Sequence, residues 1–259
     1  MPEILEVELY RRAAEQVVGR IIRTVRAPDP WYLKHGTTAR RLGRELRGRR
    51  VAAARRRGKL LVLDVDDAPS LGLRFGMTGR LQIDGEGPIE ELVYGSRRDE
   101  RAWDRLVLRF DGGGVLRLSD PRRLGGVELD PDEDRLGPDA FSVTRAELAG
   151  ALRSSAPLKA RLLDQEAIAG VGNLLADEIL WRAGLDPARP ARTLDAGELA
   201  VLHRTIRATL RDLLARGGSH TGDLQEARRL GGRCPVDGAE LERQTIGGRT
   251  TYSCPVHQA

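Results

Sequence analysis

Residues 162–187 read LLDQEAIAGVGNLLADEILWRAGLDP, and this stretch contains the most regular helical signal of the chain. Its second half, residues 172–184, repeats apolar side chains with the 3.6-residue period of a helix. Gly170 and Gly172 precede that helix and Gly184 ends it, as glycines do at helix boundaries. Asn173 stands at the helix start, where it either caps the helix or lies where the glycines bring backbone amides close to a phosphate.

Further helices are predicted over 157–164 and 194–216, so the chain beyond about residue 132 is helical. Before it, short apolar or alternating runs predict an antiparallel β domain. These runs are 60-LLVLDV-65, 71-LGLRF-75, 105-RLVLRF-110 and 115-VLRLSD-120. The segments 3–18, 37–47 and 144–152 are also predicted to be helical, and 85–101 is predicted to be a loop.

The N-terminus, Met1-Pro2-Glu3, places a candidate nucleophile beside a carboxylate. Removal of Met1 leaves a secondary amine, and a terminal amine has an ordinary pKa of about 7.7–8.0, so part of it is unprotonated near neutral pH. Glu3 and Glu6 share one face of the predicted N-terminal helix, whose positive end is expected to hold both as carboxylates. Many proteins begin with Met-Pro by chance, so the pair needs support from elsewhere in the chain.

The chain of 259 residues carries a formal net charge of +5 and a pI of about 9.7. Of its 43 basic residues only Lys34, Lys59 and Lys159 are lysines. A bias towards arginine explains this most simply, and the surplus of positive charge is compatible with a polyanionic partner. Without a membrane-length apolar run or a secretion signal, the chain is expected in the cytoplasm.

Two cysteines near the C-terminus predict a metal site rather than a disulfide in such a chain. Cys234-Pro-Val-Asp237 and Cys254-Pro-Val-His257 each have the spacing that lets two side chains reach one tetrahedral ion. Residues 243–252 between them read as a β-hairpin that turns at Gly247-Gly248. The interpretation is a zinc ribbon over 226–259 with Cys234, Asp237, Cys254 and His257 as ligands. The alternative is a degenerate ribbon in which Asp237 only caps a turn.

Several motifs together resemble the bacterial formamidopyrimidine-DNA glycosylase and endonuclease VIII family. They are 2-PEILEVE-8, 58-GKLLVL-63, 76-GMTGRL-81, 119-SDPRRLGG-126, 248-GRTTYSCPVHQ-258 and the opening stretch 162–187. The last is similar to the family's helix–two-turns–helix segment nearly residue for residue. The resemblance implies a multidomain α+β fold. It comprises an N-terminal helix with an antiparallel β-sandwich (1–131), a helical domain (132–225) and a zinc-ribbon finger (226–259).

The resemblance also implies a mechanism of base-excision DNA repair. The Pro2 nitrogen would attack the sugar of a damaged nucleotide flipped out of double-stranded DNA, and the iminium formed would promote β- and δ-elimination. Glu3 would donate a proton to the sugar ring, and Glu6 would orient the site. Lys59, on a strand, would contact phosphate and assist elimination, and Arg249, at the hairpin tip, would bind the phosphates beside the lesion. The simpler interpretation is that the side chains of Lys59 and Arg249 are both exposed to solvent and have no function.

The remaining DNA contacts implied by the resemblance lie in three places. Met77, Arg122, Arg123 and Leu124 would fill the hole left by the flipped base, although a methionine is also an ordinary core residue. Asn173 would bind a phosphate, and Lys159 would lie near the DNA backbone. The expected partner is therefore duplex DNA with a damaged base or abasic site, and we expect a monomer that binds one structural Zn²⁺.

The chain departs from the family pattern at several positions. Leu5 replaces a proline, Arg74 a histidine and Leu124 a phenylalanine, while Asp237 and His257 replace ribbon cysteines. After 217-GGSHTGDL-224 the ribbon follows quickly, whereas relatives that remove oxidised purines have a longer segment that caps the flipped base. These departures predict changed damage recognition. The alternatives are an abasic-site lyase with little glycosylase activity, a non-catalytic lesion-binding protein and a zinc-ribbon transcription factor, the last of which leaves Pro2-Glu3 unexplained.

Overall fold

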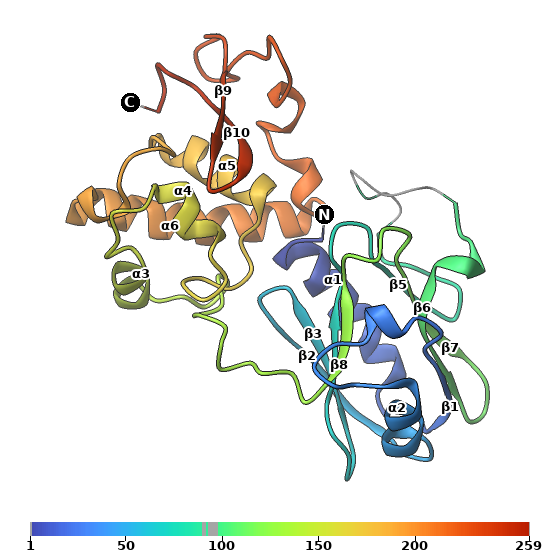
Figure 1. Ribbon diagram of the computed structural model, residues 1–259. Coiled ribbons are helices and arrows are strands. Elements are labelled where there is room, and N and C mark those ends of the chain that lie inside the picture. The colour runs from blue at the N-terminus through green and yellow to red at the C-terminus, as the bar shows by residue number, and fades with distance from the viewer. Residues whose placement is uncertain (1, 90–91, 93–97, 259) are drawn as a thin grey trace. The chain divides into compact units, whose positions relative to one another are not determined.

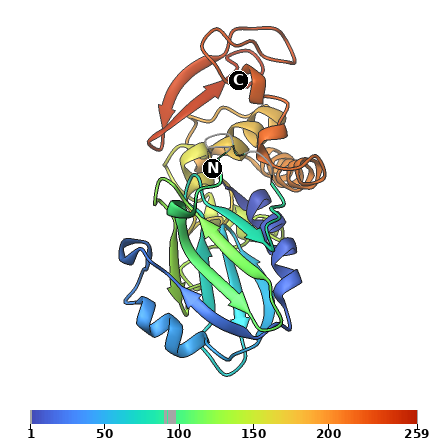
Figure 2. The same ribbon diagram turned by 90° about the vertical axis from the view of Figure 1, so that its right-hand side faces the viewer.

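Two antiparallel sheets make up most of the N-terminal half, as the alternating runs predict (Figure 1). Their strand orders are β1-β6-β7-β5 and β2-β3-β4-β8. The strands are β1 (Ile22–Arg26), β2 (Val51–Arg57), β3 (Leu60–Val65), β4 (Leu71–Arg74), β5 (Arg80–Ile83), β6 (Asp104–Phe110), β7 (Val115–Ser119) and β8 (Gly126–Leu129). Apolar side chains from both sheets form one buried cluster, so the sheets pack face to face as the predicted β-sandwich (Figure 2).

The computed structural model describes residues 2–89, 92 and 98–258, which divide into two units. Unit 1 comprises Met1–Pro2 and Glu6–Glu133, and unit 2 comprises Glu3–Leu5 and Asp134–Ala259. The ribbon falls within unit 2, where Trp181, Leu224, Cys234, Leu241 and Cys254 form a small apolar cluster of their own. The division into three domains stays a prediction.

The predicted helices are confirmed, with shifted ends. Unit 1 contains most of α1 (Ile4–Ala14), which continues as a 3₁₀ turn, and α2 (Ala39–Leu46). Unit 2 contains α3 (Arg145–Ala151), α4 (Leu158–Leu163), α5 (Asn173–Ala183) and α6 (Ala196–Ala215), followed by the hairpin of β9 (Glu242–Ile246) and β10 (Arg249–Ser253). Among the described residues no helix is long and apolar enough to cross a membrane.

The loop predicted over 85–101 falls partly on residues 90–91 and 93–97, which lie outside the described residues. Arg101 already belongs to a 3₁₀ turn, Arg101–Trp103, that leads into β6.

Candidate functional site

The Glu3 carboxylate is bound at the N-terminus of α5, far from Glu3 in the sequence. Its Oε2 accepts hydrogen bonds from the backbone N–H groups of Gly172 (2.8 Å) and Leu175 (3.2 Å), and its Oε1 accepts one from Leu174 (2.9 Å). Glu3 is fully buried. The first N–H groups of a helix lack partners within it, and the helix dipole favours an anion there. The sequence predicts that the helix which Glu3 precedes holds this carboxylate, whereas α5 holds it in the structure.

The glycines before α5 make room for the N-terminal residues. A Cβ on Gly172 would lie 2.2 Å from Cδ of Glu3 and 2.5 Å from each carboxylate oxygen. Gly170, with φ +115°, would meet the Ile4 side chain in the same way, and its carbonyl accepts the Ile4 N–H at 3.1 Å. The Gly-Val-Gly motif therefore leaves the space in which Glu3 and Ile4 pack.

Asn173 is the first residue of α5, and Gly172 occupies the cap position without a side-chain cap. The capping interpretation of Asn173 is therefore wrong. Its Nδ2 instead donates to the Thr250 carbonyl of β10 at 3.0 Å, and its buried Oδ1 has no hydrogen-bond partner among the described residues. Asn173 thus connects the start of α5 to the ribbon hairpin.

Lys159 does not lie on a surface that DNA could reach. Its side chain is fully buried, with Nζ 2.6 Å from Oδ1 of Asp177. Nζ also donates to Oγ1 of Thr251 (2.7 Å) and to the Thr250 carbonyl (3.2 Å). Burial lowers the pKa of Lys159, and the charge of Asp177 opposes that shift. This corrects the prediction of a DNA-backbone contact, because an ammonium enclosed by protein oxygens cannot contact a phosphate.

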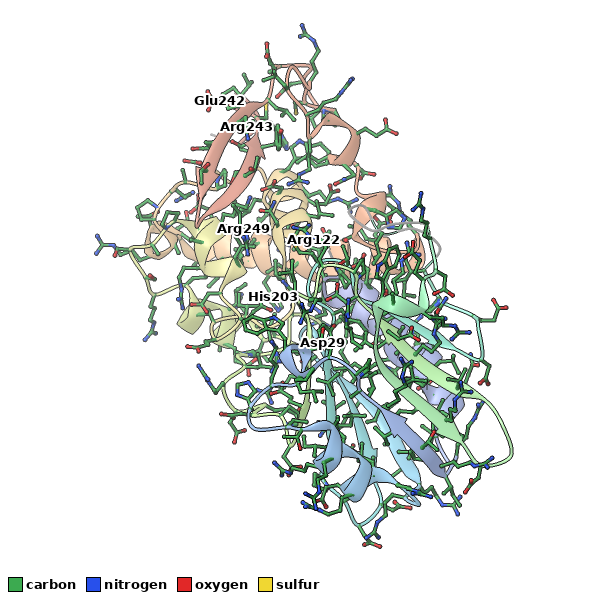
Figure 3. All side chains as sticks on the ribbon, turned by 45° about the vertical axis from the view of Figure 1, so that its right-hand side comes forward. Asp29, Arg122, His203, Glu242, Arg243 and Arg249 are labelled. Carbon is green, nitrogen blue, oxygen red and sulfur yellow. The ribbon has the colours of Figure 1, made fainter. Side chains whose placement is uncertain are left out.

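Arg249 opens β10 directly after the Gly247-Gly248 turn, and it is exposed (Figure 3). The turn approaches α4 closely, since a Cβ on Gly247 would lie 3.1 Å from Cβ of Ala160. An exposed guanidinium on a hairpin that is fixed to a helix is suited to binding a phosphate.

In unit 1, Asp120 joins the turn that carries Met77 to the loop that carries Arg122 and Leu124. Its carboxylate accepts hydrogen bonds from Oγ1 of Thr78 (2.5 Å) and from the N–H groups of Arg122 (3.2 Å) and Leu124 (3.0 Å). Asp120 is fully buried, whereas the Leu124 side chain is 53% exposed. The Asp-Pro-Arg-Arg motif alone does not predict this role of Asp120, although an Asp side chain commonly bonds backbone N–H groups just after it.

Arg123 of the same loop is held by Asp29. Its Nε and Nη2 lie 2.6 and 2.7 Å from the two Asp29 oxygens. These bonds hold the pKa of Asp29 below its ordinary value. Arg123 has a φ of +58°, a conformation unusual for a residue other than glycine. The backbone of the loop is therefore fixed, while the side chains of residues 122–124 are exposed. Figure 3 labels Asp29 and Arg122 of unit 1.

Glu6 and Lys59 occupy different parts of unit 1. Glu6 is buried on α1. The pKa of Tyr10 is raised by the burial of Tyr10 and, second, by the negative charge of Glu6. The Tyr10 hydroxyl donates to the Gly79 carbonyl at 3.1 Å. Glu6 thus lies near the Met77 turn. Lys59 lies in the turn between β2 and β3 rather than on a strand, since Gly58, with φ +55°, allows the chain to reverse there.

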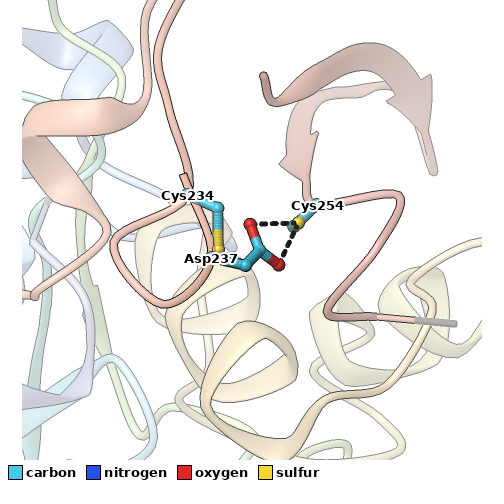
Figure 4. Close-up of side chains that lie close together, drawn as sticks. All are labelled: Cys234, Asp237 and Cys254. Carbon is cyan, nitrogen blue, oxygen red and sulfur yellow. Dashed lines mark hydrogen bonds between the residues drawn. The ribbon is translucent and has the colours of Figure 1, made fainter. Parts of the chain in front are cut away.

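Three predicted metal ligands come together in the ribbon (Figure 4). The ligand atoms of Cys234, Asp237 and Cys254 all lie within 4.8 Å of one another. Both sulfurs accept hydrogen bonds at 3.3 Å, Cys234 from Nε1 of Trp181 and Cys254 from the His257 N–H. Such donors suit thiolates, so the residues present fit a divalent ion that binds sulfur and oxygen.

Asp237 and His257 also have partners within the protein. Asp237 accepts the Ala239 N–H at 2.9 Å, a turn-capping bond that lowers the pKa of Asp237. The His257 side chain lies outside the three-residue cluster, and its Nε2 is 2.8 Å from the Trp181 carbonyl. The cap and the metal-ligand interpretation of Asp237 are thus compatible with each other.

Comparison with family models matches both halves of the chain. Residues 1–127 match the formamidopyrimidine-DNA glycosylase N-terminal domain, and residues 136–224 match the formamidopyrimidine-DNA glycosylase H2TH domain, the helix–two-turns–helix module.

Relatives and solved structures match over the whole length. A formamidopyrimidine-DNA glycosylase of Paracoccus denitrificans is 36% identical over 291 aligned positions, covering 100% of both chains. One of Thermus thermophilus is 34% identical, covering 100% of this chain and 98% of the relative. The Lactococcus lactis Fpg solved with abasic-site DNA superposes with a TM-score of 0.84 at 28% identity, covering 100% of both chains. The same protein with Fapy-dG DNA gives a TM-score of 0.83 at 28% identity, covering 99% of each.

Proposed function

This chain belongs to the formamidopyrimidine-DNA glycosylase family, and we propose that it is a base-excision repair enzyme that combines DNA glycosylase and abasic-site lyase activities. The proposal is supported above all by the position of Glu3, whose carboxylate accepts hydrogen bonds from three N–H groups at the N-terminus of α5. Glu3 directly follows Pro2, so these bonds fix a carboxylate beside the residue that becomes the N-terminal amine.

The proposed reaction begins at the Pro2 nitrogen. The unprotonated amine attacks C1′ of the damaged nucleotide, the N-glycosidic bond breaks, and the base leaves with its electron pair and takes up a proton. The Glu3 carboxylate takes up the proton that the Pro2 nitrogen loses after the attack and donates it to the ring oxygen as the C1′–O4′ bond opens and the iminium forms. Loss of a C2′ proton then expels the 3′ phosphate, and a second elimination expels the 5′ phosphate.

The other site residues are proposed to hold the DNA. Glu6 orients the reacting groups from α1. Lys59 and Arg249 bind phosphates, as does Asn173, whose Nδ2 has a second N–H besides the one that bonds Thr250. Met77, Arg122 and Leu124 replace the flipped nucleotide in the stack, and Arg123, paired with Asp29, fixes their loop. The substrate is duplex DNA, and we propose a monomer that acts in the bacterial cytoplasm.

We propose that the ribbon binds one structural Zn²⁺ through Cys234, Asp237 and Cys254, with His257 as the fourth ligand. If Nε2 of His257 donates its proton to the Trp181 carbonyl, the other ring nitrogen, Nδ1, is left with the lone pair that a metal needs. The metal would stabilise the ribbon and take no part in the chemical steps.

Asp237→Asn is expected to lower zinc affinity by about tenfold or more, since removing even an indirect partner of a metal commonly has that effect. The matched control is Asp186→Asn, because Asp186 accepts the Ala188 N–H at 2.8 Å in a similar turn. Metal content by mass spectrometry and the thiolate–cobalt absorption of Co²⁺-loaded protein measure the effect. Equal zinc retention in both variants would reduce Asp237 to a turn cap.

One observation favours the alternative of a lyase with little glycosylase activity. The segment after α6 is short and fixed: Glu178 accepts the N–H groups of Asp223 and Leu224, each at 3.0 Å. Residues held in this way leave little chain to cover a flipped base.

Strand incision decides between the two activities. The Met1-processed protein is expected to cut duplexes with an abasic site and, as a glycosylase, duplexes with formamidopyrimidine-guanine or 8-oxoguanine. Pro2→Gly should lose at least about 100-fold of the incision rate in each case. Incision of the abasic duplex alone would favour the lyase alternative, and no incision of any duplex would favour a lesion-binding protein.

A further inference from the structure

A buried polar chain in unit 2 runs from α5 to the backbone of Arg249. Asp177 of α5 pairs with Nζ of Lys159 at 2.6 Å, and Nζ donates to Oγ1 of Thr251 at 2.7 Å. The Thr251 hydroxyl in turn donates to the Arg249 carbonyl at 3.2 Å. The side chains of Asp177 and Lys159 are fully buried, and Thr251 is buried as well.

The other Asp177 oxygen fixes the segments on either side. Oδ2 accepts hydrogen bonds from Nη2 (2.8 Å) and Nε (3.1 Å) of Arg228, and the Tyr252 N–H is 3.4 Å away. The Arg228 guanidinium lies 5.6 Å from the centre of the Tyr252 ring. One carboxylate therefore connects α4, the first residues of the ribbon and β10.

Such a cluster costs desolvation energy, and residues of similar volume without charge would often stabilise a core equally well. The cluster also makes directional hydrogen bonds, which apolar side chains cannot make. These bonds lead from Lys159 through Thr251 to the carbonyl of Arg249, the first residue of β10. The ribbon's metal ligands, by contrast, lie at the other end of the hairpin, Cys254 directly following β10.

We propose that Asp177, acting through Lys159 and Thr251, is the positioning residue that fixes Arg249 for phosphate binding. This inference rests on the phosphate-binding role of Arg249 in the proposed function. The hairpin is thus held at both ends, by the buried ionic chain near Arg249 at the tip and by the proposed metal near Cys254 at the other end.

The test measures the binding of duplex DNA with one tetrahydrofuran abasic-site analogue at several salt concentrations. The slope of log K against log[salt] is negative, and loss of one phosphate contact reduces its magnitude by about 0.9, so that binding at ~0.1 M salt weakens by about eightfold. Arg249→Ala, Asp177→Asn and Thr251→Val are each expected to show this loss. Asp177→Asn combined with Arg249→Ala should bind no more weakly than Arg249→Ala alone.

Glu178→Gln is the matched control, because Glu178 is the neighbouring buried carboxylate of α5 and its bonds go to residues 182 and 223–224. It should lower the melting temperature and leave the salt slope unchanged. Thr251→Val only replaces the hydroxyl by a methyl group, so it keeps the test valid if Asp177→Asn fails to fold.

The outcomes separate the two claims. If Arg249→Ala changes the slope while Asp177→Asn, where it folds, and Thr251→Val do not, the positioning role of Asp177 is wrong and the proposed function stands. If Arg249→Ala leaves the slope unchanged, Arg249 binds no phosphate, and both its assigned role and this inference fail.

Discussion

Glu3→Gln is expected to slow base release and abasic-site cleavage by about 100-fold or more, the usual contribution of a positioned proton donor. A glutamine amide cannot donate a proton to the sugar ring. The amide nitrogen of the glutamine would replace one of the two carboxylate oxygens, and it cannot accept a hydrogen bond. It would therefore face either the N–H of Leu174 or the N–H groups of Gly172 and Leu175, which are donors themselves. Single-turnover rates on abasic and damaged duplexes measure the effect.

Glu8→Gln serves as the control for this variant. Glu8 lies on the same helix, α1, and its carboxylate pairs with Arg11 and Arg56 within unit 1. It should keep nearly full activity. A Glu3→Gln protein that retains more than a tenth of the wild-type rate would exclude Glu3 as the proton donor.

Gly172→Ala is expected to cause the second large effect, through sterics alone. The Gly172 backbone, with φ −118° and ψ −167°, is open to any residue, but a Cβ would lie 2.2 Å from Cδ of Glu3. Either the carboxylate or the start of α5 must move. Overpacking of this kind destabilises a protein by about 1–3 kcal/mol. The melting temperature should fall, and activity should fall towards that of Glu3→Gln.

A double-mutant cycle identifies the cause. In a Glu3→Ala background the group that meets the new Cβ is absent, so most of the stability loss from Gly172→Ala should disappear. Gly150→Ala is the control: Gly150 lies within α3, and a Cβ there meets no atom within 4 Å. It should leave stability unchanged or raise it slightly. An undiminished loss in the Glu3→Ala background would place the strain elsewhere.

The helices and strands could be predicted from the sequence, because the spacing of apolar residues within each segment distinguishes a helix from a strand. Residues 60–65 are apolar except for Asp64 and form the largely buried strand β3. Residues 172–184 have a helical repeat between glycines and form α5. The hairpin turn at Gly247-Gly248 was predictable for the same local reason, and both glycines have positive φ.

The partners of the site residues could not be predicted, because they depend on contacts between distant segments. Nothing near Glu3 in the sequence indicates that it binds Gly172, and nothing near Lys159 indicates that Asp177 and Thr251 enclose its amine. A lysine next to a recognised motif resembles a surface cation until its burial is known. Asp120 was overlooked because its partners include Thr78, on a turn formed much earlier in the chain.

Peptide mapping of the borohydride-reduced complex with abasic-site DNA shows whether the Pro2 nitrogen is the nucleophile. Reduction converts the iminium into a stable bond, so the attached residue can be read by mass spectrometry. If Pro2 is the nucleophile, the sugar adduct lies on the N-terminal Pro2 peptide. Only Lys34, Lys59 and Lys159 offer competing side-chain amines in this chain. An adduct on one of these lysines, with an unmodified Pro2, would show that Pro2 is not the nucleophile.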